Sequence, residues 1–275
     1  MSWIAVRVDG VADTDRPAVI EALVGAGAQG VQEVGSALLT HLDSATDVGA
    51  LEGELRRCAN GMALVWAPDP SADRAVWEPQ VGVHRVGRVA VAPPWRAAEV
   101  PPDAIPILID PSTAFGTGEH ESTRGALELL QGTLRIGDRV ADLGTGSAIL
   151  GIAAAKLGAS RVIAIEIDEQ AMGNAEDNIA RNGVADRVTV FHGDASVFLP
   201  LLAPVDLVIA NIISTVIIDL SPIIRDALRS GGRVVIGGML RSERSDVAAA
   251  LGADGWEIRA EHTEGDWWSS VIEPR

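Results

Sequence analysis

The chain has 275 residues, 47% of them hydrophobic, so it is long enough for two domains with sizeable cores and too apolar to be disordered. Its formal net charge of −16 argues against binding to a nucleic-acid backbone and suits either a basic partner or solubility alone. With Cys58 as the only cysteine, no secretory leader and no apolar run of bilayer length, we expect a cytoplasmic protein that does not enter membranes.

Residues 1–66 alternate between short apolar runs and helical stretches. Strands are expected at 3–8, 30–34, 37–42 and 62–66, and helices at 16–27 and 47–60. This βαββαβ order is typical of the ferredoxin-like split βαβ fold. Because the segment carries no obvious catalytic group, we expect a small α+β domain that recognises a macromolecule.

Residues 67–104 are rich in proline and tryptophan, which indicates a linker followed by a connecting strand. Trp77 and Trp95 are expected to pack between domains, because tryptophans are seldom fully exposed. Across residues 105–275, strands and helices alternate, which predicts a mainly parallel sheet with helices on both faces. The chain closes with two extended stretches around Gly265 and Asp266, the pattern of an antiparallel hairpin.

A glycine-rich unit spans residues 140–168 and reads as strand, turn, helix, strand and carboxylate. Gly144 and Gly146 allow a sharp turn, and Ser147 is placed to cap the following helix. The free N–H groups of that helix and Glu166, about 20 residues downstream, suit a ribose diol. The pattern therefore predicts a nucleoside site, although an ordinary βαβ unit without a ligand looks the same.

The spacing of the turn narrows the choice of nucleoside. A dinucleotide fingerprint needs glycine at the position held by Ile149, and no phosphate-binding lysine motif follows the turn. The turn resembles the first motif of Rossmann-like methyltransferases, which bind S-adenosylmethionine, a ligand without phosphate. Asp194, after the next strand, is placed to meet the adenine amino group.

Two further segments flank this unit. Upstream, an irregular glycine-rich loop leads into a helix that starts between His120 and Thr123; it is either a ligand lid or a structural turn in which Ser122 or Thr123 caps the helix. Downstream, Asn211 ends a buried strand at the edge where α/β proteins bind ligands. Its carbonyl can accept an amine hydrogen, or the residue merely ends the strand.

The upstream segment DPSTAFGTGEHEST, residues 110–123, resembles the signature of the bacterial ribosomal protein lysine methyltransferases, the PrmA family. The first motif, the KLGA helix end, the N-x-x-x-NG stretch at 178–183 and the ANI stretch at 210–212 follow in family order. The resemblance covers essentially the whole chain. It implies an α/β, Rossmann-like class I methyltransferase domain at 105–275, with a ferredoxin-like substrate-recognition domain at 1–66.

The resemblance also implies chemistry and site residues. The methyl donor would be S-adenosylmethionine, and the acceptors would be lysine or α-amino groups of large-subunit ribosomal protein eleven. Asn211 would be the catalytic residue that orients a neutral amine. The residues expected to contact the cofactor are Phe115, Gly116, Thr117, Thr123, Gly144, Gly146, Glu166, Asp194 and Asn211. The chain departs from the family pattern at Ser112, Ala148, Glu166 and Ile213.

Several alternatives stay open. Asn211 is followed by Ile-Ile-Ser rather than Pro-Pro-aromatic and the chain has no tyrosine, which favours a flexible amine over a planar amide or base. Another amine substrate, a nicotinamide-dependent oxidoreductase and a non-catalytic cofactor-binding module are the competing hypotheses. The five histidines show no ligand spacing, so no metal is expected. We expect a monomer that acts on a basic ribosomal protein without contacting nucleic acid.

Overall fold

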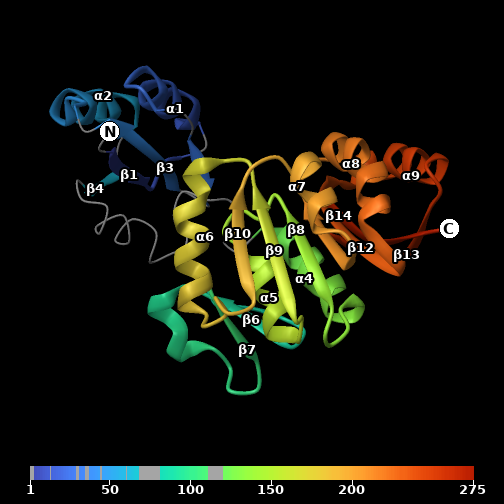
Figure 1. Cartoon of the computed structure of the whole chain (residues 1–275). Helices are drawn as coiled ribbons and strands as arrows, with labels where there is room; N and C mark the ends of the chain where they lie inside the picture. The colour runs from blue at the N-terminus through green and yellow to red at the C-terminus, as the bar shows by residue number, and fades with distance from the viewer. Residues whose placement is uncertain are drawn as a thin grey trace. The chain divides into compact units, whose positions relative to one another are not determined.

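The computed structural model describes residues 3–12, 14–28, 31–34, 37–43, 45–59, 61–67, 81–110 and 120–275. Contacts between residues divide the chain into two compact units, Met1–Gln80 and Val81–Arg275 (Figure 1). Several residues singled out from the sequence lie outside the described ranges: Trp77, Ser112, Phe115, Gly116 and Thr117. Trp95 lies in the second unit, in the short 3-10 helix η1 (Pro94–Glu99), and is half-buried.

The first unit has the element order βαββαβ that the sequence predicts. Its elements are β1 (Trp3–Asp9), α1 (Arg16–Gly25), β2 (Gln32–Val34), β3 (Ala37–Asp43), α2 (Val48–Cys58) and β4 (Ala63–Ala67). The strands pair in the order β2-β3-β1-β4, and all neighbours are antiparallel. Alternate residues of β1, such as Val6 and Val8, point into a core that also takes Leu23 from α1 and Leu55 from α2. The two helices therefore cover one face of this sheet.

The second unit is built on a seven-stranded sheet in the order β10-β9-β8-β11-β12-β14-β13. The strands are β8 (Arg139–Leu143), β9 (Arg161–Glu166), β10 (Val188–His192), β11 (Val205–Asn211), β12 (Leu228–Leu240), β13 (Trp256–Glu264) and β14 (Trp267–Pro274). The first five pair in parallel, and β14 then joins β12 antiparallel and closes a hairpin with β13. The predicted α/β class and the hairpin around Gly265 are confirmed.

Helices lie on both faces of this sheet (Figure 1). They are α4 (Glu121–Thr133), α5 (Ile149–Leu157), α6 (Glu169–Arg181), α7 (Ala195–Leu202), α8 (Ser214–Ala227) and α9 (Arg244–Ala253). Strand β11 shows the division: Leu207 and Ile209 belong to the core with α4, α5 and α6, whereas Val208 and Ala210 belong to the core with α7, α8 and α9. Successive strand residues point to opposite faces, so a continuous apolar run fills both cores.

A small sheet completes the second unit. It contains β5 (His84–Val86), β6 (Val89–Ala92) and β7 (Ile105–Leu108), with β6 in the middle and fully buried. Val89, Val91 and Ile107 pack into the core that includes α4 and α5. After β7 the chain continues to Asp110, and this segment lies beside α6. Across the described ranges, no helix has the length and apolar character that a membrane crossing requires.

Candidate functional site

A cavity of 740 Å³ opens at the carboxyl ends of β8, β9 and β11. The turn after β8 (144–146), the turn after β9 (166–168) and the end of β11 (211–213) line it. Ligands of α/β proteins bind at this edge of a parallel sheet, where the strand order reverses. The described residues expected from the sequence to contact a cofactor all line this one cavity: Thr123, Gly144, Gly146, Glu166, Asp194 and Asn211.

The glycine-rich turn packs tightly against the end of β11. Gly144 has φ +65°, and a Cβ at this position would lie 2.5 Å from Cγ2 of Ile212. A side chain here would therefore push Ile212, the residue after Asn211, out of place. The turn is also held by β9, because the N–H groups of Gly144 and Thr145 both donate to the carbonyl of Ile165.

The start of α5 differs from the expectation that Ser147 caps it. The cap position belongs to Ala148, which adopts a left-handed conformation with φ 66° and makes no capping hydrogen bond through its side chain. Among the described residues, Ala148 is the one non-glycine with positive φ, a conformation that costs an L-residue about 1–2 kcal/mol. Its methyl group is fully buried in the core with α5 rather than in the cavity, so the departure from glycine leaves the cavity open.

Glu166 holds the glycine-rich turn in place. Its Oε2 accepts a hydrogen bond from the N–H of Gly146 at 2.7 Å, and its Oε1 accepts from the N–H groups of Ile167 and Asp168 at 2.9 and 3.0 Å. The carboxylate thus connects the turns that follow two adjacent strands. Glu166 also lines the cavity, and a carboxylate oxygen can accept more than one hydrogen bond, which suits a ligand hydroxyl.

Asp142 lies behind the same turn and is buried. Its Oδ2 accepts from the Thr145 hydroxyl at 2.6 Å and from the N–H of Gly151 at 2.9 Å. Burial raises the pKa of Asp142 to about 6; these two hydrogen bonds oppose the rise, and the nearby charge of Glu166 adds to it. The residue therefore ties the turn to α5 and titrates in a range that experiments can reach.

Asp142 should make the stability of the protein fall as the pH rises. Its pKa in the unfolded chain is about 3.9, so the folded state binds the extra proton up to a pH of about 6. The stabilisation that this proton gives the folded state is complete below the pKa of the unfolded chain. It is lost as the pH rises through the pKa of the folded state. In urea unfolding, the stability of Asp142→Asn relative to the unsubstituted protein should rise by about 1–2 kcal/mol between pH ~5 and ~8. A difference that is independent of pH would contradict this assignment.

Two polar atoms at the cavity are buried and unsatisfied. Thr123 Oγ1, on a fully buried residue in the first turn of α4, and Asn211 Oδ1, at the end of β11, have no hydrogen-bond partner among the described residues. Leaving such an atom unpaired costs about 1–3 kcal/mol, so these positions are suited to a ligand that supplies the missing partner. Both side chains line the same cavity as the glycine-rich turn.

Two glycines of β12 make room for the end of β11, and sequence reasoning missed them. The N–H of Ile212 donates to the carbonyl of Gly237 at 3.1 Å. A Cβ on Gly237 would lie 2.6 Å from Asn211 Oδ1, and one on Gly238 would lie 2.7 Å from the carbonyl oxygen of Ile212. The adjacent glycines after an apolar strand run were the available signal, because glycine inside a strand often marks a close approach.

Trp267 is another residue that the sequence did not single out. It lines the cavity, and its ring centroid lies 4.5 Å from that of His120, with the planes at 68°. His120, rather than Ser122 or Thr123, is the N-cap of α4: its Nδ1 accepts from the N–H of Ser122. Burial lowers the pKa of His120, which favours the neutral ring.

Asp194 lies at the rim of the cavity, where it is exposed. It is the N-cap of α7, and its Oδ1 accepts from the N–H of Ser196 at 2.8 Å, a bond that lowers the pKa of this carboxylate. Asp194 is therefore an anionic acceptor that faces the solvent side of the cavity. Within the described ranges, no three histidine, cysteine or acidic side chains gather as a metal site requires.

Comparisons with known proteins converge on one family. The family model described as Ribosomal protein L11 methyltransferase (PrmA) matches residues 71–274. The chain is 41% identical over 239 residues to the ribosomal protein L11 methyltransferase of Thermus thermophilus, covering 80% of this chain and 90% of that relative. It is 40% identical over 183 residues to that of Desulforamulus reducens, covering 66% of this chain but only 58% of the relative.

Some relatives are matched over only part of their length, and a solved structure is also similar to the chain. The chain spans 66% of the Chloroflexus aurantiacus relative and 61% of the Desulfitobacterium hafniense relative, both ribosomal protein L11 methyltransferases. Among solved structures, the chain is similar to a ribosomal protein L11 methylase from Lactobacillus delbrueckii subsp. bulgaricus, with a TM-score of 0.64 and 31% identity. That match covers 70% of this chain and 98% of the other.

Proposed function

The chain belongs to the ribosomal protein L11 methyltransferase family, and on this premise we propose that it transfers methyl groups from S-adenosylmethionine to amino groups of ribosomal protein L11. The acceptors are lysine ε-amino groups, α-amino groups or both. The observation that carries the proposal is the unsatisfied Oδ1 of Asn211, beside the glycine-rich turn in one cavity. Residues 1–66 recognise this basic substrate, residues 105–275 carry the chemistry, and the protein works as a cytoplasmic monomer that makes no contact with nucleic acid.

The cavity fits S-adenosylmethionine, and each group around it has a role. The turn at Gly144 and Gly146 would lie against the nucleoside, Glu166 would accept a hydrogen bond from a ribose hydroxyl, and Asp194 would accept one from the adenine amino group. The hydroxyl of Thr123 gains a hydrogen-bond partner from the cofactor. When bound, S-adenosylmethionine supplies a methyl group already activated by its sulfonium sulfur, so the protein needs no nucleophile of its own.

The residues of the chain then have to position a neutral amine. A free lysine has a pKa of about 10.4, and a partly desolvated cavity lowers this value by disfavouring the charged form. The Oδ1 of Asn211 accepts one N–H of the amine and so aims its lone pair into the cavity. Holding two reactants in this way supplies about 7–11 kcal/mol in well-oriented cases, which is the main contribution required here.

Asn211→Ala should lower the rate of methyl transfer by about 100-fold, because a misplaced amine loses part of the benefit of orientation. The measurement is the initial rate of label transfer from S-adenosylmethionine to purified L11. Val197→Ala, at an exposed position on α7 that does not line the cavity, is the control and should keep the rate. Equal rates for Asn211→Ala and the unsubstituted chain would contradict the role given to Asn211.

Competing hypotheses differ in which ligand binds and in whether a methyl group is transferred. Saturable binding of NADH without binding of S-adenosylmethionine would favour the oxidoreductase. Binding of S-adenosylmethionine with no methylation of any protein in a ribosomal extract would favour a non-catalytic module. Label on an extract protein other than L11 would keep the activity and replace the substrate. Binding titrations with NADH and with S-adenosylmethionine, followed by labelling of the extract, therefore separate these three hypotheses from methylation of L11.

A further inference from the structure

Three asparagines follow one another at four-residue intervals on α6 and just after it: Asn174, Asn178 and Asn182. All three bond through their side chains to the backbone of residues 108–110, the segment that ends β7 and leaves it. We propose that Asn178 is a positioning residue that connects this segment to the glycine-rich turn and thereby holds the nucleoside side of the cavity in its binding geometry. The proposal rests on the proposed function, because it assumes that S-adenosylmethionine binds there.

Asn178 is fully buried, and every hydrogen-bonding position of its amide is used. Its Oδ1 accepts from the N–H of Asp110 at 2.9 Å and from Nη1 of Arg181 at 2.7 Å. Its Nδ2 donates to the carbonyl of Ser147 at 3.2 Å and to Oδ1 of Asn174 at 3.3 Å. An asparagine amide offers two acceptor positions and two donors, so this environment matches its full capacity.

The four partners also fix the orientation of the amide. Rotating it by half a turn would place its NH₂ group against the N–H of Asp110 and the guanidinium of Arg181, so donors would face donors. The oxygen therefore serves the segment after β7, and the nitrogen serves the glycine-rich turn. Because the residue is buried, losing any of these hydrogen bonds is costly at low dielectric.

The glycine-rich turn is held from two sides. On the β9 side, the N–H of Gly146 donates to Glu166. On the α6 side, the carbonyl of Ser147 accepts from Asn178. These two contacts bracket the residues that precede α5, so the loss of the second one frees the turn to shift away from the cavity. We therefore expect weaker cofactor binding when the bond from Asn178 is removed.

Asn182 provides a matched control at the end of the same helix. Its Oδ1 accepts from the N–H of Leu108 at 2.9 Å, and its Nδ2 donates to the carbonyl of Leu108 at 2.6 Å. It thus pairs with the backbone of β7 much as a neighbouring strand would, without a described contact to the glycine-rich turn. Removing its side chain should loosen β7 and leave the turn in place.

The test compares Asn178→Asp, Asn178→Ala and Asn182→Ala in the full chain. Asn178→Asp is isosteric and keeps the acceptor for Asp110 and Arg181, but it puts an oxygen against the carbonyl of Ser147. Two readouts are needed: titration with S-adenosylmethionine, and hydrogen exchange of the amides in residues 108–110 and 144–151. The second readout does not depend on activity or on bound cofactor.

Asn178→Asp should bind S-adenosylmethionine about tenfold more weakly, with faster exchange in residues 144–151 and unchanged exchange at Asp110. Asn178→Ala should show the same loss of affinity together with faster exchange at Asp110. Asn182→Ala should exchange faster at Leu108 and keep its affinity.

Unchanged exchange in residues 144–151 of Asn178→Asp would overturn the inference, and so would an equal loss of affinity in Asn182→Ala. If the unsubstituted chain does not bind S-adenosylmethionine at all, the proposed function fails. In that case the exchange pattern still decides whether Asn178 couples the two segments.

Discussion

Replacing Gly238 with alanine is expected to lower the free energy of unfolding by about 2–5 kcal/mol, the sum of a strained backbone and a steric clash. The residue has φ +79°, which an alanine adopts only at a cost. Its Cβ would also lie 2.7 Å from the carbonyl oxygen and 2.9 Å from the amide nitrogen of Ile212, and backbone atoms cannot rotate away as a side chain can. Because Ile212 follows Asn211, the rate of methyl transfer should fall as well.

Gly231 on the same strand is the matched control for this substitution. It has φ +73°, but a Cβ there would meet nothing within 4 Å. Gly231→Ala should therefore cost only the backbone term, about 1–2 kcal/mol, and keep the rate of methyl transfer. Urea unfolding and initial rates of both variants give the comparison. Equal losses in the free energy of unfolding for the two variants would show that the close approach of β12 to Ile212 does not contribute to stability.

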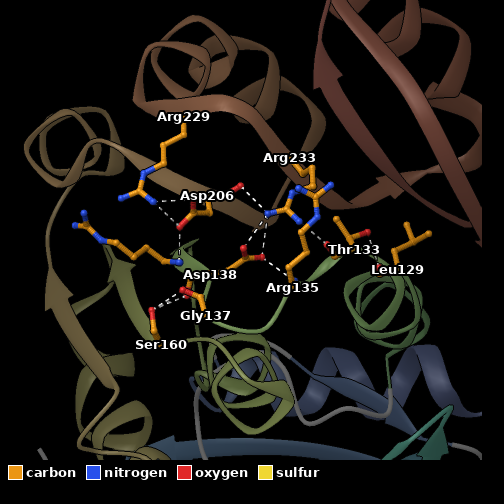
Figure 2. Close-up of polar contacts among 10 residues, drawn as sticks. Leu129, Thr133, Arg135, Gly137, Asp138, Ser160, Asp206, Arg229 and Arg233 are labelled. Carbon is orange, nitrogen blue, oxygen red and sulfur yellow. Dashed lines mark hydrogen bonds and ion pairs between the residues drawn. The ribbon is translucent and has the colours of Figure 1, made fainter.

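Asp138→Ala is expected to destabilise the protein by about 3–5 kcal/mol, because it leaves a buried guanidinium without its counter-ion. Both Asp138 oxygens accept from Nη2 of Arg233 at 3.0 Å, and the two side chains are only 8% and 5% exposed. Figure 2 shows Arg233 between Asp138 and the carbonyl of Thr133, to which its Nη1 donates at 2.9 Å. The pair lies at the amino end of β8, at the edge opposite the cavity, so the rate per folded molecule should be unchanged.

The exposed pair in the same view is the control for this prediction. Arg229 donates to Asp206 at 3.0 Å, but its side chain is 45% exposed (Figure 2). Arg229→Ala should therefore cost about 0–1 kcal/mol in urea unfolding. Replacing Asp138 and Arg233 together by leucine and methionine should recover much of the loss, since no charge then stays buried alone. If Asp138→Ala costs no more than Arg229→Ala, the buried pair does not support the fold in this way.

The sequence was sufficient to predict most of the elements and the edge of the sheet that carries the site. Continuous apolar runs, such as the one ending at Asn211, predict strands buried on both faces, and the glycine-rich turn is a local signal because Gly144 and Gly146 need positive φ. The position of Asn211 followed from the same logic, since a residue that ends a parallel strand lies at the ligand edge.

Features that depend on contacts between distant segments could not be predicted in this way. The expectation that Ser147 caps α5 was wrong because the helix begins one residue later, after the left-handed Ala148. Glu166 was interpreted as a ribose ligand only, and its hydrogen bond to Gly146 depends on how two turns meet in space. Trp267 lines the cavity from a distant part of the chain, and no local pattern marks it.

The most direct test of the central claim is the intact mass of purified ribosomal protein L11 after incubation with this chain and S-adenosylmethionine. We expect L11 to gain mass in whole methyl increments that map to lysine or α-amino groups. The gain should be absent when either the chain or S-adenosylmethionine is left out. An unchanged mass of L11, under conditions in which the chain binds S-adenosylmethionine, would contradict the proposed function.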